Sequence, residues 1–486
     1  MNTALAEKAD TSALNNYASK QYVDSAIAAI PAGSGSGSTT NINLGANNAG
    51  KIVVIGPTGL SAAGTITEES IMEALIKSGS YTAEGVVGLE IDYENKSVMR
   101  IQEAYGKAAG SDFNSYSMYG GRMRCNVADN GTINAFYGDP SYTEDGSNGE
   151  VMVYQPKFYY ERIPVKIESS ANGTIIRKET LLLSAEPKTG FKLHPLFKDG
   201  DNELDYVLIS AYEGSINNNI LTSRANTKPT SNTVLSDFIT AAQAHGTGWN
   251  TMNMAVESAI QMLGIVELGT MNGQVAIERG ISDITSVSNY NCSSLTGSTA
   301  SLGNGTGAAS ETINEINGTQ TTYSVNGKRA ISYRGMENPW GNIWCLVRDI
   351  KIVGANEGNA GTPYVLDDDS YESIGFKLPS AYGYISAMGY GNKNYDWIYL
   401  PIECMNANSA APVGDNVWTQ PHLNGETLLA VGGSWGFEDG NGFFSYGGDQ
   451  FTSASSQKSY STRLMFVPTK NNIYNNNIAA WTAKMG

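Results

Sequence analysis

The sequence predicts an α+β chain of several parts: an N-terminal coiled-coil-type helix, a small β-rich module and a large C-terminal domain with much irregular structure. Three observations support this division. Apolar residues recur at helical spacing within residues 1–30, and a Gly/Ser run follows at 31–40. The remainder alternates short apolar runs with glycine-rich turns. At 486 residues the chain is long enough for two to four domains.

Charge and composition restrict the class of protein. The chain has 31 basic and 47 acidic residues, so it lacks the excess of Lys and Arg that nucleic acid or an anionic membrane would require. Charged residues make up only 16% of the chain and glycine contributes 54 residues, so solubility depends largely on Asn, Ser, Thr and Gly. This composition is typical of an extracellular or virion protein, and a cytoplasmic protein stays open as the alternative. Membrane insertion is not expected, because no run of 18 apolar residues occurs.

Cysteine and histidine are too scattered to predict a metal centre or a cofactor site. The four cysteines form no Cys-x-x-Cys pair, and we expect free thiols in preference to disulfides. The three histidines form no His-x-x-x-His pair. These residues are Cys125, Cys292, Cys345, Cys404, His194, His245 and His422.

Residues 1–30 are expected to form an oligomerising helical stalk that anchors the chain. Val23, Ile27 and Ile30 are spaced by four and three residues, as in a coiled-coil seam. A single helix of this length is marginal in water without partners, so a homotrimer is preferred, and a frayed helix is the alternative. The Gly/Ser alternation at 31–40 has no side chains to bury and predicts a flexible linker.

Residues 41–110 are expected to form a small mixed α/β collar module. An apolar run at 51–56 predicts a strand. Thr67 is placed to cap an amphipathic helix whose apolar face holds Ile71, Leu75 and Ile76. Two strand-like runs, at 86–93 and 97–101, predict a hairpin.

The large domain is expected to span residues 111–486. A strand predicted at 151–163 is interrupted at Pro156, and a second strand runs into a turn within 205–214. Helices are predicted at 236–245 and 253–263, followed by a strand at 265–268. Residues 282–326 are rich in Ser, Thr, Asn and Gly and are interpreted as a surface excursion. The final core segment begins at residue 330, and residues 471–486 predict a short helix or a docked tail.

Two tryptophan-bearing glycine turns occur late in this domain. They are Asn-Pro-Trp-Gly-Asn-Ile-Trp at 338–344 and Val-Gly-Gly-Ser-Trp at 431–435, and Ser-Thr-Arg-Leu-Met-Phe-Val at 461–467 closes the domain. In this order they resemble the C-type lectin-like domain in its formylglycine-generating-enzyme branch, which bacteriophage receptor-binding proteins also use. Stretches at 118–129, 142–149 and 151–160 resemble fibre proteins of phages and prophages that infect gut bacteria. The resemblance covers roughly residues 111–468 and implies a structural motif made of Trp340, Trp344, Gly433, Trp435, Phe443 and Phe444.

The same fold is used by enzymes, but their catalytic residues are missing from this sequence. The oxidase branch carries a cysteine pair just after the Gly-Gly-Ser turn, and residues 433–444 contain no cysteine. The sulfoxide-synthase branch binds iron through a histidine cluster, which three scattered histidines do not supply. We therefore expect no enzymatic activity. Acidic runs at 367–369 and 438–439 leave a glycan-cleaving tail spike as a less favoured alternative, because two carboxylates suffice for glycoside hydrolysis.

Phage receptor-binding proteins of this fold display loops after the Gly-Gly-Ser-Trp turn, so the resemblance implies a binding surface there. Tyr, Asn and Ser side chains combine rigid contact area with adaptable hydrogen bonds. An ordinary turn-rich surface is the alternative. The candidate binding residues are Phe437, Glu438, Asp439, Asn441, Ser445, Tyr446, Asp449, Gln450 and Phe451. A second aromatic group at 390–399 is interpreted as core in preference to a glycan-binding platform.

Together these features predict a virion fibre protein of a bacteriophage that binds the host cell surface through a C-type lectin-like head. The expected partners are further copies of the chain, other virion structural proteins at the N-terminus, and a bacterial surface glycan or protein. The alternative is a capsid-anchored head fibre or decoration protein with accessory adhesion. The first 40 residues would discriminate tail from capsid attachment, because they specify the anchor, but their sequence does not identify the virion component that they bind.

Overall fold

The computed structural model describes residues 51–56, 59–65, 82–354, 361–367, 369–406, 412–418, 426–448, 457–470 and 472–486. The contacts divide the chain into two units, 1–67 and 68–486. In the first unit, β1 (Lys51–Gly56) pairs antiparallel with β2 (Gly59–Thr65), and β1 is the strand predicted at 51–56. The predicted stalk with Val23, Ile27 and Ile30, the linker at 31–40 and the helix predicted after Thr67 lie outside the described residues.

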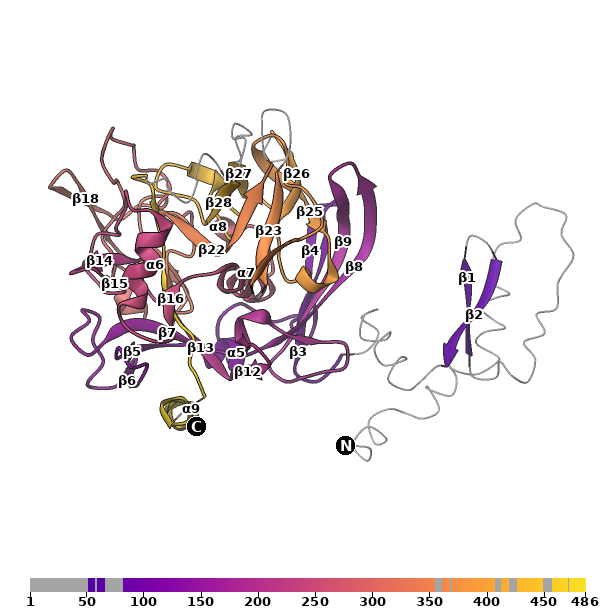
Figure 1. Ribbon diagram of the computed structural model, residues 1–486, viewed down its shortest axis with the longest axis horizontal. Helices are drawn as coiled ribbons and strands as arrows, with labels where there is room; N and C mark the ends of the chain where they lie inside the picture. The colour runs from indigo at the N-terminus through magenta and orange to yellow at the C-terminus, as the bar shows by residue number, and fades with distance from the viewer. Residues whose placement is uncertain are drawn as a thin grey trace, which may run out of the picture. The chain divides into compact units, whose positions relative to one another are not determined.

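The second unit is built on a 14-stranded sheet (Figure 1). Its principal path runs through β10 (Lys192–Leu193), β8 (Tyr159–Ser170), β9 (Gly173–Ser184), β25 (Gly383–Tyr390), β27 (Asn416–Trp418), β29 (Tyr446–Gly447), β28 (Glu426–Val431), β22 (Trp344–Val353), β23 (Thr362–Asp367) and β24 (Ser370–Ser373). Four further strands join beside this path: β3 (Val86–Asp92), β4 (Ser97–Gln102), β26 (Pro401–Met405) and β30 (Tyr460–Ser461). The strands come from nearly the whole unit, so the sheet is held together by contacts between segments distant in sequence.

A second sheet in this unit has six strands. Its order is β16 (Trp249–Thr251), β31 (Leu464–Phe466), β13 (Tyr206–Ser210), β7 (Glu150–Pro156), β5 (Met123–Val127) and β6 (Ile133–Phe136). Strand β31 lies between β13 and β16, so the segment near the C-terminus completes this sheet. The break predicted at Pro156 is confirmed, because β7 ends there and β8 joins the other sheet.

Helix α7 (Met254–Leu268) is the central helix of the unit and contacts β3, β9 and β22. The Asn253 side chain caps it by accepting a hydrogen bond from the Val256 amide, and Gly269 in a left-handed conformation ends it. Fourteen of its fifteen residues are buried, so it is surrounded on all sides. The strand predicted at 265–268 is therefore wrong: these residues form the last turn of α7.

The remaining helices are short or peripheral. They are α5 (Ser117–Gly120), α6 (Leu235–Gln243), α8 (Gly273–Ala276) and α9 (Asn472–Met485). The helix predicted at 236–245 corresponds to α6, and the predicted C-terminal helix corresponds to α9. Strands and loops outweigh helices in the described residues, which confirms a β-rich α+β unit with much irregular structure. None of the helices in the described ranges is both long and apolar enough to cross a membrane.

The hairpin β3–β4 belongs to the large sheet. It was predicted at 86–101 as part of the collar module, but β3 pairs antiparallel with β9 along its whole length, from Val86 opposite Ser184 to Asp92 opposite Lys178. Leu89 and Ile91 are buried in the main hydrophobic core. The boundary predicted at residue 110 is therefore corrected, because the long-range pairing with β9 includes this hairpin in the large unit.

The segment 282–326 is anchored more firmly than its composition suggests. It contributes β17 (Gly307–Ala308), which pairs with β20 (Ile331–Tyr333), and the hairpin β18 (Thr312–Ile316) with β19 (Thr319–Tyr323). Strand β20 also pairs with β21 (Met336–Glu337), and the short hairpins β11 (Lys198–Asp199) with β12 (Asn202–Glu203) and β14 (Ser215–Asn217) with β15 (Ile220–Thr222) complete the described strands. A separate buried cluster includes Cys292 and Trp435. The interpretation as a purely surface excursion is therefore wrong for this segment.

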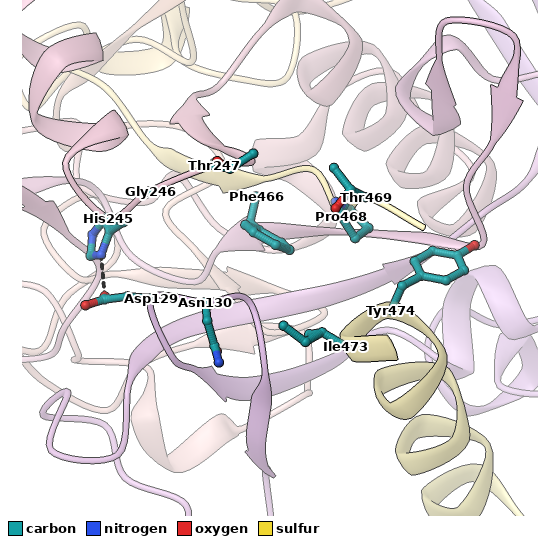
Figure 2. Close-up of a pocket in the computed structure, with 10 residues that line it drawn as sticks. All are labelled: Asp129, Asn130, His245, Gly246, Thr247, Phe466, Pro468, Thr469, Ile473 and Tyr474. Atoms are coloured by element: carbon teal, nitrogen blue, oxygen red, sulfur yellow. Dashed lines mark hydrogen bonds and ion pairs between the residues drawn. The ribbon is translucent and has the colours of Figure 1, made fainter. Parts of the chain in front are cut away.

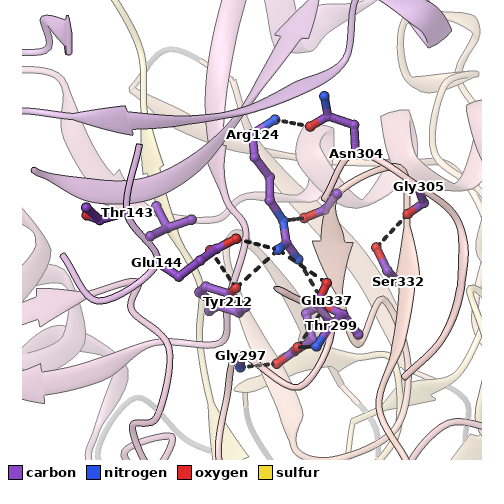
Figure 3. A network of polar contacts seen from close by, with 12 residues as sticks. Arg124, Thr143, Glu144, Tyr212, Gly297, Thr299, Asn304, Gly305, Ser332 and Glu337 are labelled. Carbon is purple, nitrogen blue, oxygen red and sulfur yellow. Dashed lines mark hydrogen bonds and ion pairs between the residues drawn. The ribbon is translucent and has the colours of Figure 1, made fainter. Parts of the chain in front are cut away.

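A buried polar network fixes the middle of this segment to β5 (Figure 3). The Arg124 guanidinium donates to the Gly335 carbonyl at 2.8 Å, to Glu144 at 3.1 Å and to the Thr299 hydroxyl at 2.9 Å. Glu337 accepts hydrogen bonds from the amide and the hydroxyl of Thr299 at 2.7 and 2.8 Å. A buried Arg is tolerated here because its charge is paired and its donors are used.

Candidate binding surface

The two tryptophan turns predicted as the structural motif lie against each other. The Gly341 amide donates to the Gly432 carbonyl at 2.9 Å, and the Trp435 amide donates to the Asn342 carbonyl at 3.0 Å. The motif residues are all buried: Trp340, Trp344, Gly433, Trp435, Phe443 and Phe444. The turns therefore form a rigid base for the residues that follow residue 435.

Gly433 is required by the tightness of its turn. Its φ is +86°, a left-handed conformation, and a Cβ there would lie 1.6 Å from the Asn441 side-chain oxygen. Asn441 in turn donates from Nδ2 to the Ser434 carbonyl at 3.0 Å. The Gly-Gly-Ser turn and the loop after it are thus packed together.

Only part of the predicted binding segment reaches the surface. Glu438 is exposed, and Phe437 and Asp439 are half-buried, at the start of the 3-10 turn η7 (Glu438–Gly440). Asp449, Gln450 and Phe451 lie outside the described residues.

The assignment of Asn441, Ser445 and Tyr446 to the binding surface is wrong. All three side chains are fully buried. The Ser445 hydroxyl donates to the Gly440 carbonyl, and the Tyr446 hydroxyl donates to the Tyr399 carbonyl and accepts from Gln261 at 2.7 Å. The hydroxyl groups of Ser445 and Tyr446 are satisfied inside the protein, so their residue type did not indicate exposure.

Three aromatic side chains form a surface that we call the aromatic step: Tyr382, Trp418 and Phe437. The Tyr382 and Trp418 rings are 5.4 Å apart, and the Trp418 and Phe437 rings are 6.1 Å apart and nearly perpendicular. The Phe437 ring also contacts the ring of the buried Trp344, with centroids 5.2 Å apart. The Trp344 ring in turn stacks on Tyr460, with centroids 6.1 Å apart. Tyr382 is 58% exposed and Trp344 is buried, so this row of rings extends from the core to the solvent.

Tyr382 and Trp418 were not predicted as site residues from the sequence. Tyr382 directly precedes β25, and Trp418 is the last residue of β27. These two strands are distant in sequence and become neighbours only in the folded sheet. No local spacing relates either residue to Phe437. Only the strand order β25-β27-β29 brings the three segments together.

Carboxylates border the aromatic step on one side. The Tyr384 hydroxyl donates to Asp439 Oδ1 at 2.6 Å, and burial together with this hydrogen bond raises the pKa of Tyr384 to about 12. Gln274 donates from Nε2 to the Glu438 and Asn441 carbonyls at 3.2 and 2.7 Å, which holds η7 in place. Aromatic faces stack on sugar rings or apolar side chains, and carboxylates accept hydrogen bonds from hydroxyls or ammonium groups.

The other candidate groups are part of the framework. Tyr395, Trp397 and Tyr399 are buried, in the turn that follows β25, which agrees with the interpretation of this group as core. Asp367 accepts a hydrogen bond from the Tyr395 hydroxyl at 2.8 Å. All four cysteines are free. In the ranges that the structure describes, no three His, Cys, Asp or Glu side chains are grouped so as to hold a metal ion.

The solved structures with partial similarity to this chain include two variants of one protein. The "Major Tropism Determinant U1 Variant" is 12% identical over 71% of this chain and 71% of that chain, with a TM-score of 0.25. The "Major Tropism Determinant P3c Variant" is 13% identical over 84% of this chain and 90% of that chain, also with a TM-score of 0.25. No family model matches the sequence, and no curated protein matches it.

Proposed function

We propose that the chain is a virion fibre protein of a bacteriophage that binds the host cell surface through the aromatic step. The observation that carries this proposal is the position of the step. Phe437 lies just after the Gly-Gly-Ser-Trp turn, and the step places Tyr382 at 58% exposure on a base of buried aromatic residues. This is the segment from which phage adhesins with similar motifs are expected to display their binding residues.

The step suits recognition because its geometry is fixed before a partner arrives. Phe437 packs on Trp344, and the Tyr384–Asp439 hydrogen bond holds the adjacent turn. A preformed site loses little conformational entropy on binding. Exposed aromatic side chains supply most of the contact energy in many interfaces, and bordering carboxylates supply orientation.

The surface of one chain is small, so its binding is expected to be weak. Burying one large apolar side chain contributes roughly 1.5–3 kcal/mol, and association must first offset lost translational and rotational freedom. A homotrimer joined through the stalk would present three such surfaces and raise the apparent affinity. We therefore include trimerisation through Val23, Ile27 and Ile30 in the proposal, with a non-catalytic role for the head.

Attachment to the virion is assigned to the N-terminal 40 residues, on a tail or a capsid. A capsid-anchored head fibre would use the same step for accessory adhesion. The proposed receptor is a bacterial surface glycan or protein.

The test is binding of the purified full chain to cells of the phage's host, measured by flow cytometry. Tyr382→Ala removes the most exposed ring of the step and is expected to weaken binding at least tenfold. Tyr105→Ala is the matched control, because Tyr105 is 75% exposed and lies outside the step. Equal binding by both variants, with unchanged thermal unfolding, would contradict the proposal. Periodate or protease treatment of the cells then distinguishes a glycan receptor from a protein receptor.

A further inference from the structure

A cavity of about 360 Å³ lies at the second sheet, away from the aromatic step (Figure 2). Its walls come from the β5–β6 turn with Asp129 and Asn130, from the loop between α6 and β16 with Thr247, and from the segment around Phe466 and Ile473. Figure 2 shows the Phe466 ring in the middle of the lining residues. Ligand pockets span about 300–1,000 Å³, so this cavity suits a small ligand.

The wall nearest the β5–β6 turn is rigid. His245 contacts Asp129 Oδ1 through Nδ1 at 2.7 Å and the Leu221 carbonyl through Nε2 at 2.7 Å, so both ring nitrogens are occupied. The Trp249 indole donates to the Asp129 carbonyl at 2.7 Å and packs on Phe466 with ring centroids 5.1 Å apart.

The opposite wall is held by α9. Tyr474 donates from its hydroxyl to Asp205 at 2.6 Å and stacks on Tyr206 at 5.5 Å. Asn477 bonds the β5–β6 turn directly, accepting from the Ile133 amide at 2.9 Å and donating to the Gly131 carbonyl at 2.8 Å. The cavity is therefore preformed by three segments that are locked to one another.

The lining favours a neutral ligand that has both an apolar face and hydroxyl groups. Among the described residues that line the cavity there is no Lys or Arg, and both ring nitrogens of His245 already contact protein oxygens, so these residues offer an anion no free basic group. Phe466 and Ile473 supply apolar surface, and Asn130 and Thr247 supply neutral hydrogen-bonding groups. A pyranose ring has this combination, with C–H groups on one face and hydroxyls around its edge.

We propose that this cavity binds one sugar residue as a second, independent ligand site. Figure 1 shows β5, β6 and α9 at the lower edge of the unit and β27 and β28, near the aromatic step, at the upper edge. The site therefore does not depend on the aromatic step, and loss of either leaves the other testable. The side chain of Asp129 is 73% exposed and belongs to the lining, so its carboxylate is placed to accept hydrogen bonds from the hydroxyls of a bound sugar.

The test is ligand-observed saturation-transfer NMR on the full chain. The probes are glucose, galactose, mannose and N-acetylglucosamine, with methylammonium as a cation probe and inorganic phosphate as an anion probe. At least one sugar is expected to bind with a millimolar Kd. Thr247→Trp fills the cavity from an exposed position and is expected to weaken that binding at least tenfold. Thr240→Trp, on the exposed face of α6 outside the lining, is the matched control and is expected to bind as the unaltered chain does.

The remaining outcomes separate the ligand classes. Asp129→Asn keeps a hydrogen-bond acceptor and is expected to retain sugar binding within threefold. Binding of methylammonium alone, lost in Asp129→Asn, would replace the sugar with a cation. Binding of phosphate alone would contradict the assignment of a neutral ligand. Absence of binding for all four sugars, or sugar binding that survives Thr247→Trp, would overturn the proposal.

Discussion

Glu213 and Glu257 are acidic side chains enclosed by the core of the large unit. Burial raises the pKa of Glu213 to about 7 and that of Glu257 to about 8, and the nearby Arg463 offsets only part of this effect. Both values exceed the value of about 4.3 expected for Glu in an unfolded chain. Between the pKa of an unfolded Glu and the raised pKa of each buried Glu, the folded state therefore binds more protons than the unfolded state does. The contribution of these two groups to the free energy of unfolding is therefore largest below about pH 4.3. It decreases as pH rises from about 4.3 to about 7 for Glu213 and to about 8 for Glu257.

Glu257→Gln is expected to remove part of this pH dependence. Glutamine has nearly the same shape, carries no charge and keeps an oxygen for the hydrogen bond that Gln261 donates at 3.3 Å. The variant should match the unaltered chain near pH 5 and be more stable at pH 8 by about 1–3 kcal/mol. Denaturant unfolding at both pH values measures the difference. The exposed Glu311→Gln is the control, and an unchanged pH slope in Glu257→Gln would exclude this account.

Gly433→Ala tests the packing of the turn under the aromatic step. The added methyl would require a left-handed conformation and would meet Asn441, so a loss of about 2 kcal/mol or more is expected. Gly106→Ala shares the positive φ, at +76°, but has open space around the new methyl and should lose only about 1 kcal/mol. Thermal unfolding compares the two. Similar losses would show that the contact with Asn441 relaxes readily.

Among the elements, α9 is docked by aromatic stacking more than by a hydrophobic face. Trp481 stacks on Tyr154 at 5.2 Å, Tyr154 stacks on Tyr206 at 4.5 Å, and Tyr206 stacks on Tyr474 at 5.5 Å. The Trp481 indole also donates to the Gly121 carbonyl at 2.8 Å. The helix thus contacts β7 and β13, the two central strands of the second sheet, through one row of rings.

Trp481→Ala is expected to destabilise this docking by about 2–3 kcal/mol. Hydrogen exchange should then increase in α9 and β6, while α7 keeps its protection. Thr482→Ala, at an exposed position of the same helix, should leave exchange unchanged. If α9 remains protected in Trp481→Ala, the stacked row does not hold the helix.

Local pattern predicted several elements and failed where tertiary contacts decide. The hairpin β3–β4, the break at Pro156 and helix α6 follow from short-range signals. Helix α7 was predicted five residues too short, because Ile265 and Val266 favour strands in isolation and a helix buried on all sides has no amphipathic period.

The candidate site was predicted only at Phe437, Glu438 and Asp439. Tyr446 and Ser445 are polar residues whose hydrogen-bond partners lie inside the protein. Their polarity therefore led to the wrong prediction that they are exposed. Trp418 and Tyr382 join the site through strand pairing, which a single sequence does not encode locally. The pairing of the two tryptophan turns was implied by their resemblance to one fold and not by their spacing.

At the scale of the whole unit, the two proposed ligand surfaces lie at different edges. The aromatic step is associated with β25 and β27 of the large sheet, and the cavity with β5, β16 and β31 of the second sheet. The net charge of −16 on the chain opposes approach to a negatively charged cell surface, so the proposed binding would depend on short-range contacts at defined sites. A head with this arrangement is expected to bind with the step facing outward.

Cryo-electron tomography of virions adsorbed to host cells tests the central claim most directly. The account predicts density for this chain between the particle and the cell envelope, with the edge that carries Tyr382, Trp418 and Phe437 facing the envelope. Density at a tail would identify a tail adhesin, and density on the shell would identify a head fibre. Density with this edge packed against the particle, away from the cell, would contradict the proposed role of the aromatic step.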